Sequence, residues 1–106
     1  MTLNAAERHR TGEEFAQNLA LSGLTPHEAA TDLAFTPERL RRTLDVDPAS
    51  DPVDVWQLRD YLQQAVRDAG GTPAPYSVLN DRSRLKARLW FRLRDAPRRK
   101  DLSGPV

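Results

Sequence analysis

Apolar residues recur at the spacing of a helix in five stretches of the chain, and prolines, glycines and polar clusters separate these stretches. In the first stretch Phe15, Ala16 and Leu19 form one apolar stripe, while the neighbouring acidic residues face water. Either Asn4 or Thr2 can cap the start of this helix, since both side chains accept a hydrogen bond from a free backbone N–H. The pattern predicts a helix from about residue 4 to about residue 21.

The segment TPHEAATDLAFTPERL, from Thr25 to Leu40, contains two helix starts eleven residues apart. Thr25 caps the first, with proline in the first helical position and Glu28 completing a capping box. Thr36 and the proline after it repeat the signal. Because a residue before proline is disfavoured in helical geometry, the earlier helix must end by about Ala34. We therefore expect two short helices joined by a tight turn, the second ending at about Leu44.

The residue types in this segment fit a phage-repressor-like helix-turn-helix from Thr25 to Leu44. Such a motif needs a small residue where the two helices cross, and Ala30 stands there. Leu33 fills the angle between the helices, and Leu40 and Leu44 face the core. Ala34 occupies the turn position where glycine is usual, so a left-handed conformation there costs energy.

A helix-turn-helix of this kind reads DNA with the exposed face of its second helix. The predicted DNA-binding residues are Thr36, Glu38, Arg39, Arg41 and Arg42. Arginine can donate two hydrogen bonds to guanine, glutamate can accept from cytosine, and a threonine at a helix start can hold a phosphate. The alternative is that these arginines are merely solvated, since the same caps and turns occur in helical proteins that never contact DNA.

The rest of the chain predicts two further helices. After the loop DVDPASDP, Asp51 caps a helix of about 53–69, with Trp56 in the core and Asp54 favoured by the dipole of the first turn. The stretch 76–79 is expected either to cover an edge of the core or to form a short strand. A last helix, about 82–93, is expected to turn inward the side chains of Leu85, Leu89 and either Phe91 or Trp90.

These elements predict an all-α protein, a compact bundle of about five helices in one domain of residues 1–95. Residues 96–106 combine proline, glycine and charge, and we expect them to form a mobile basic tail. Trp90 and Phe91 are adjacent, so they cannot share one helix face. They are expected either in the core or in a homodimer interface.

The net charge of +1 conceals an uneven distribution. Arg39, Arg41 and Arg42 form one basic island, and the sequence from residue 80 onward forms another within an otherwise acidic chain. If the fold brings the islands together, basic residues of the last helix add phosphate contacts. With no cysteine and no apolar run of the ~20 residues that span a bilayer, we expect a cytoplasmic protein outside the membrane.

The sequence offers no catalytic or metal-binding pattern. His9 and His27 are the only histidines and lack acidic residues at ligand spacing, so both are predicted on the surface. The serines have no histidine near them in sequence, and the glycine pair at 70–71 follows a helix instead of preceding one. We therefore expect a protein without enzymatic activity, cofactor or small-molecule substrate.

The blocks NLALSGLTPHEAATDLAFTPERL, DPVDVWQLRDYL, PYSVL and RLWFRLRD together resemble an uncharacterised bacterial family known as domain of unknown function 2316. The similarity runs from about Leu3 to Arg99. It implies a compact helical domain of helix-turn-helix type, with no established activity or site. We predict a small transcriptional regulator that binds double-stranded DNA, either alone or as a homodimer. The alternative is a protein-interaction or dimerisation module without DNA binding.

Overall fold

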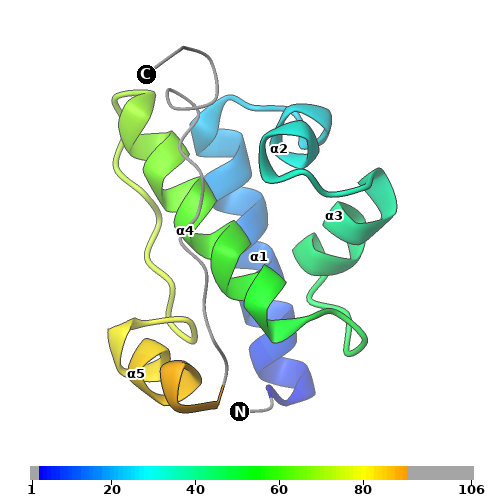
Figure 1. The fold of residues 1–106 in the computed structure, drawn as a ribbon. Coiled ribbons are helices and arrows are strands. Elements are labelled where there is room, and N and C mark those ends of the chain that lie inside the picture. The colour runs from blue at the N-terminus through cyan, green and yellow to red at the C-terminus, as the bar shows by residue number, and fades with distance from the viewer. Residues whose placement is uncertain (1–2, 91–106) are drawn as a thin grey trace.

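The computed structural model describes residues 3–90, with side chains as far as Ala87, and this range contains five helices and no strand (Figure 1). The helices are α1 (Ala5–Ser22), α2 (Pro26–Leu33), α3 (Pro37–Leu44), α4 (Pro52–Asp68) and α5 (Asp81–Trp90). The predicted all-α fold is therefore confirmed. Residues 96–106, predicted to be a mobile tail, lie outside the described residues.

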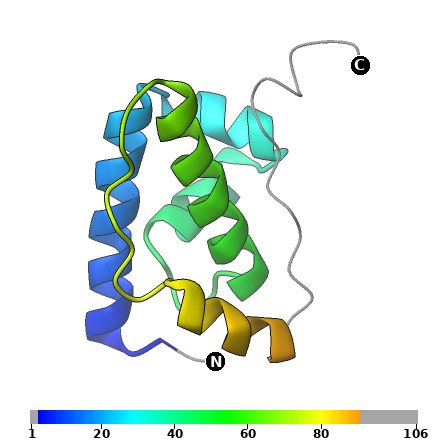
Figure 2. The same cartoon turned by 90° about the vertical axis from the view of Figure 1, so that its left-hand side faces the viewer.

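The two long helices α1 and α4 lie against each other and form the centre of the molecule (Figures 1 and 2). Phe15 of α1 packs among fully buried residues of α4, including Leu58 and Leu62. Trp56 belongs to the same core, as predicted. Buried aromatic and aliphatic side chains contribute roughly 1.5–3 kcal/mol each to folding, so this contact supplies much of the stability.

The start signals read from the sequence form the predicted caps. Asn4 and Glu7 make a capping box at α1, and Thr25 and Glu28 make another at α2. Asp51 caps α4 by accepting a hydrogen bond from the N–H of Val53 at 2.8 Å. These side chains satisfy backbone donors that each helix would otherwise leave unpaired.

The turn between α2 and α3 has the left-handed conformation that, according to the sequence analysis, costs energy at Ala34. Ala34 adopts a left-handed backbone with φ 59°, and the N–H of Phe35 donates to the carbonyl of Ala30 at 2.9 Å. Ala30 and Leu33 are buried, and the Tyr61 hydroxyl of α4 donates to Asp32 of α2 at 2.5 Å. The turn is thus held in place by the core beneath it.

The connector between α4 and α5 runs back alongside α1 (Figure 2). Asn18 fixes it with two hydrogen bonds to the backbone of Ala74, one donated at 3.1 Å and one accepted at 2.9 Å. Glu14, predicted to face water, accepts hydrogen bonds from Ser77. Tyr76 packs edge-on against Phe15 with ring centres 5.8 Å apart. The segment 76–79 therefore covers the core and forms no strand.

Two predicted core positions are wrong. Ala16 is exposed, whereas Asn18 is buried on the side of Phe15, because its side-chain amide bonds to the connector. Leu85 is 70% exposed, because α5 packs through Ala87 and through Arg84, which lies over the Trp56 ring and pairs with Asp60. The side chains of Leu89, Trp90 and Phe91 lie outside the described range.

The left-handed Ala34 generates a stability prediction. Ala34→Gly is expected to raise the free energy of unfolding by about 0.5–1 kcal/mol, because glycine adopts this backbone without the steric cost of a Cβ atom. Urea unfolding followed by circular dichroism measures the change. Ala69 is the matched control, since it also ends a helix and is exposed but has φ −81°. Ala69→Gly should lower stability, and an equal loss in both variants would contradict the argument.

Candidate nucleic-acid interface

The predicted DNA-binding residues lie on α3 and at its start, and α3 stands at one edge of the molecule (Figure 1). Thr36 is exposed, and its hydroxyl oxygen accepts a hydrogen bond from the N–H of Arg39 at 3.1 Å. The proton of that hydroxyl is left to donate to another acceptor. On the inner side Leu40 and Thr43 are buried, whereas Leu44 is only partly buried.

Arg41 forms an exposed ion-pair network along α3. Its guanidinium lies 2.5 Å from Glu38 and 3.3 Å from Asp45, and all three side chains are more than half exposed. The hydrogen bond from Arg41 lowers the pKa of the Glu38 carboxyl, and the same bond raises the pKa of Arg41. Exposed pairs of this type stabilise a protein little, so Arg41 can exchange these partners for others at low cost.

Arg39 has a different position from the one the sequence indicated. Two of its nitrogens donate to the carboxylate of Asp54 at 2.8 and 2.7 Å, and its guanidinium lies 4.1 Å from the centre of the Phe35 ring. This hydrogen bond raises the pKa of Arg39. Asp54 is 5% exposed, so the bond compensates a buried charge. Arg39 thus ties α3 to α4.

The sequence did not predict that Asp54 pairs with Arg39. There, the helix dipole alone accounted for an acidic residue in the first turn of α4. A second acidic residue three positions after the Asp51 cap was the available signal. It could not identify the partner, because Arg39 lies fifteen positions away on another helix.

Arg42 is exposed, and within the described side chains its guanidinium makes no hydrogen bond or ion pair. It stands at a small polar cavity of about 150 Å³ that it shares with Arg39, Ser50 and Asp51. Of the three arginines of α3, it is therefore the one whose donors are most available to a ligand.

Within the described side chains, the basic residues of α5 do not share a surface with those of α3. Figures 1 and 2 place α3 and α5 on opposite sides of α4. Around α3 the sequence from Thr36 to Asp54 carries five acidic and three basic residues. The described basic residues of α5 therefore add no positive charge next to α3, and the sequence around α3 is acidic.

Other chemistry gains no structural support in the described part of the chain. His9 and His27 are exposed, as predicted, and His9 lies 3.3 Å from Glu13. No group of three histidine, aspartate or glutamate residues is arranged there to hold a metal ion. None of the described helices combines the length and apolar character that crossing a bilayer requires.

The Arg39–Asp54 pair generates the second stability prediction. Arg39→Ala should lower the free energy of unfolding by about 2 kcal/mol, because it leaves a buried carboxylate without its guanidinium. Adding Asp54→Asn should recover part of that loss, which chemical unfolding of all variants would measure. Arg42→Ala on the same helix is the control and should change stability by less than about 0.5 kcal/mol. Equal effects of Arg39→Ala and Arg42→Ala would exclude a structural role for the pair.

Comparison with known proteins identifies a family match. The family described as "Uncharacterized protein conserved in bacteria (DUF2316)" matches residues 1–92, which is most of the chain. No curated protein and no solved structure shows significant similarity. The resemblance read from the sequence blocks is thereby confirmed, although the match says nothing of a helix-turn-helix. On this match, the chain belongs to the DUF2316 family of uncharacterized proteins conserved in bacteria.

Proposed function

We propose that the α2–α3 unit is a helix-turn-helix that binds double-stranded DNA as a transcriptional regulator, with α3 in the major groove. The observation that carries the proposal is the exposed Arg42, whose guanidinium has no partner among the described side chains. It is supported by the two eight-residue helices, the short turn at Ala34, and the buried Ala30 and Leu33 between them. These are the features by which such motifs fix the angle between their helices.

In this proposal Arg42 and Arg41 donate to guanine O6 and N7, and Glu38 accepts from cytosine N4. To do so, Arg41 and Glu38 break their mutual ion pair and bond instead to guanine and to cytosine. Breaking that pair costs little free energy, because both side chains are exposed. Thr36 donates its hydroxyl proton to a phosphate. Arg39 acts as a positioning residue, since its bonds to Asp54 fix the helix that carries the others.

The acidic surroundings of α3 bear on the affinity. Nonspecific DNA binding depends on neutralised phosphates, and three arginines facing five acidic residues neutralise few of them. Recognition by this protein then depends more on contacts with bases than on electrostatic attraction to the phosphates. A homodimer would present two copies of α3 to half-sites about 34 Å apart and double the number of such contacts.

The first test selects duplexes from a random pool with the full chain at low salt, and then measures affinity for the selected duplex. Arg42→Ala should weaken binding about 10- to 100-fold, as the loss of a bidentate base contact does. Arg67→Ala is the matched control, because Arg67 is an exposed arginine in the last turn of α4. It should leave the affinity unchanged. Selection of no duplex, or equal loss in both variants, would reject the proposal.

A second candidate function is a protein-interaction module, and the acidic surroundings of α3 favour it. In that case α3 and its neighbouring carboxylates would receive a basic protein surface. The two functions predict different effects of a carboxylate near α3 on DNA binding. A carboxylate beside α3 repels phosphates if DNA binds there and has no effect on DNA otherwise.

Asp45→Asn separates the two functions. Asp45 is exposed at the end of α3, and its loss as a charge should raise DNA affinity about two- to fivefold at low salt, with the gain shrinking as salt is added. Asp81→Asn, on the opposite side of the molecule, is the control and should have no effect. Fluorescence anisotropy with a labelled duplex measures both. If Asp45→Asn leaves DNA affinity unchanged, the interaction module becomes the better candidate.

A further inference from the structure

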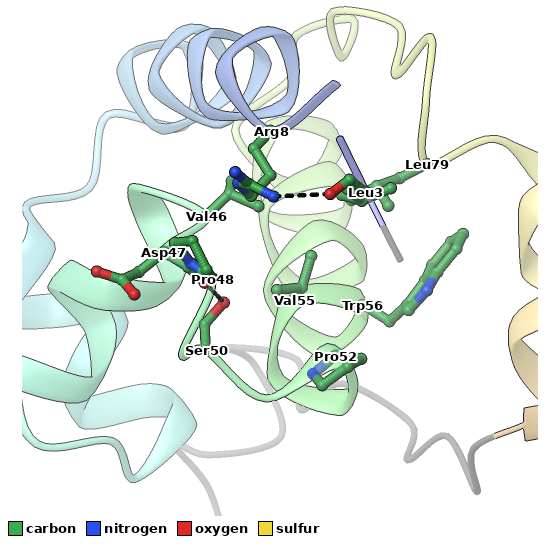
Figure 3. Close-up of a pocket in the computed structure, with 10 residues that line it drawn as sticks. All are labelled: Leu3, Arg8, Val46, Asp47, Pro48, Ser50, Pro52, Val55, Trp56 and Leu79. Atoms are coloured by element: carbon green, nitrogen blue, oxygen red, sulfur yellow. Dashed lines mark hydrogen bonds between the residues drawn. The ribbon is translucent and has the colours of Figure 1, made fainter. Parts of the chain in front are cut away.

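A second site lies on the other side of the loop that follows α3. A pocket of about 240 Å³, open to solvent on one side, is lined by the start of α1, the loop from Asp45 to Asp51, the first turns of α4 and the end of the connector (Figure 3). Most of its lining is apolar and includes Val46, Val55, Trp56 and Leu79. None of these contacts belongs to the outer face of α3.

The apolar wall of the cavity is rigid. Val46, Val55, Trp56 and Leu79 are all buried members of the main core, so neighbouring side chains fix their positions. A preformed apolar cavity binds small apolar molecules without the cost of ordering its walls. Because an apolar cavity of about 150 Å³ is known to hold benzene, this one has room for a ring or chain of about six carbons.

The rim of the cavity carries a positive charge. Arg8 is half-buried there and donates one hydrogen bond, from Nη1 to the carbonyl of Leu3 at 2.7 Å (Figure 3). A guanidinium has five N–H donors, and within the described residues no carboxylate pairs with this one. The other charged lining residue, Asp47, points away from Val55 and accepts a hydrogen bond from Ala49 instead. An anionic group is therefore favoured at the rim.

The backbone of the cavity wall is strained. Val46 has φ 50°, a left-handed conformation that β-branched residues rarely adopt. It is held by a hydrogen bond from its N–H to the Thr43 carbonyl and by burial of its side chain. Glycine would form this turn without strain, so the burial of the valine side chain has to compensate the free energy that the strained backbone costs. Strained residues of this kind are concentrated at ligand sites.

We propose that this cavity binds a small aliphatic carboxylic acid of about six carbons. The carboxylate accepts hydrogen bonds from the free donors of Arg8, and the aliphatic chain lies against Leu3, Pro48 and Pro52, over the buried Val55 and Trp56. The charge on the rim selects an acid over an alcohol of the same length. The apolar depth of the cavity selects a longer chain over acetate.

The test titrates the full chain with hexanoate, hexan-1-ol and acetate while nuclear magnetic resonance follows the Val46 and Val55 methyl groups and the Trp56 indole. Hexanoate should shift these signals saturably with a Kd of about 1 mM or below. Hexan-1-ol should bind about tenfold more weakly, because it lacks the charge-assisted bond to Arg8. Acetate should produce no saturable shift at the same signals.

Two variants locate the site. Arg8→Gln should remove the preference for hexanoate over hexan-1-ol and leave the affinity for the alcohol unchanged. Arg10→Gln, an exposed arginine two residues further along α1, is the matched control and should keep the preference. Val55→Phe fills the cavity and should abolish binding of both ligands, with the thermal midpoint reporting whether the variant is folded. Where that variant unfolds, the two arginine variants still decide.

Three outcomes would overturn the proposal. The first is the absence of saturable shifts with hexanoate at about 10 mM, tenfold above the expected Kd. The second is equal affinity for the acid and the alcohol. The third is an Arg8→Gln variant that behaves like Arg10→Gln. Because no DNA is present in these titrations, their result is independent of the proposal made for α3.

Discussion

The bidentate ion pair between Arg39 and Asp54 decides where α3 stands. Helices of eight residues, such as α2 and α3, are too short to be stable alone and depend on what they pack against. Leu40 supplies the apolar part of that packing, and the ion pair supplies its direction, since two parallel hydrogen bonds fix orientation as well as distance. The outer face of α3, with Arg42 exposed on it, follows from this attachment.

The loop between α3 and α4 connects the two sites proposed in this protein. Its Asp47 N–H donates to the carbonyl of Arg42 at 3.0 Å, and its Val46 side chain forms part of the apolar cavity. The loop therefore borders the proposed DNA-binding face on one side and the proposed carboxylate site on the other. Its left-handed Val46, which follows the Asp45 cap of α3, resembles the left-handed Ala34 at the end of α2, because each is a residue other than glycine in a conformation that glycine favours. Both endings cost stability, which the core around them compensates.

Local features of the fold could be predicted from the sequence, and features set by distant partners could not. Thr25, Asp51 and their neighbours specify helix starts through bonds that span two or three residues, so the sequence contains the whole interaction. Asn18 is buried because it meets Ala74, 56 positions away, and no helical periodicity distinguishes it from a solvated amide. The same reason explains why neither the Asp54 partner of Arg39 nor the exposure of Leu85 could be predicted. The cavity beside Arg8 could not be predicted for a related reason, since its walls come from three separate segments of the chain.

The distribution of charge around α3 limits the kind of partner that this helix can bind. A protein that holds nucleic acid mainly through phosphates needs a broad positive surface, and the separation of α3 from α5 does not provide one. What the fold provides instead is a narrow, rigid helix face with one arginine paired to its own neighbours and one left unpaired among the described side chains. Such a face favours a partner with complementary hydrogen-bonding groups at fixed positions over a partner of high charge density. The edges of bases meet that requirement, and they do so only if the acidic residues beside α3 keep a distance from the phosphates that flank those bases.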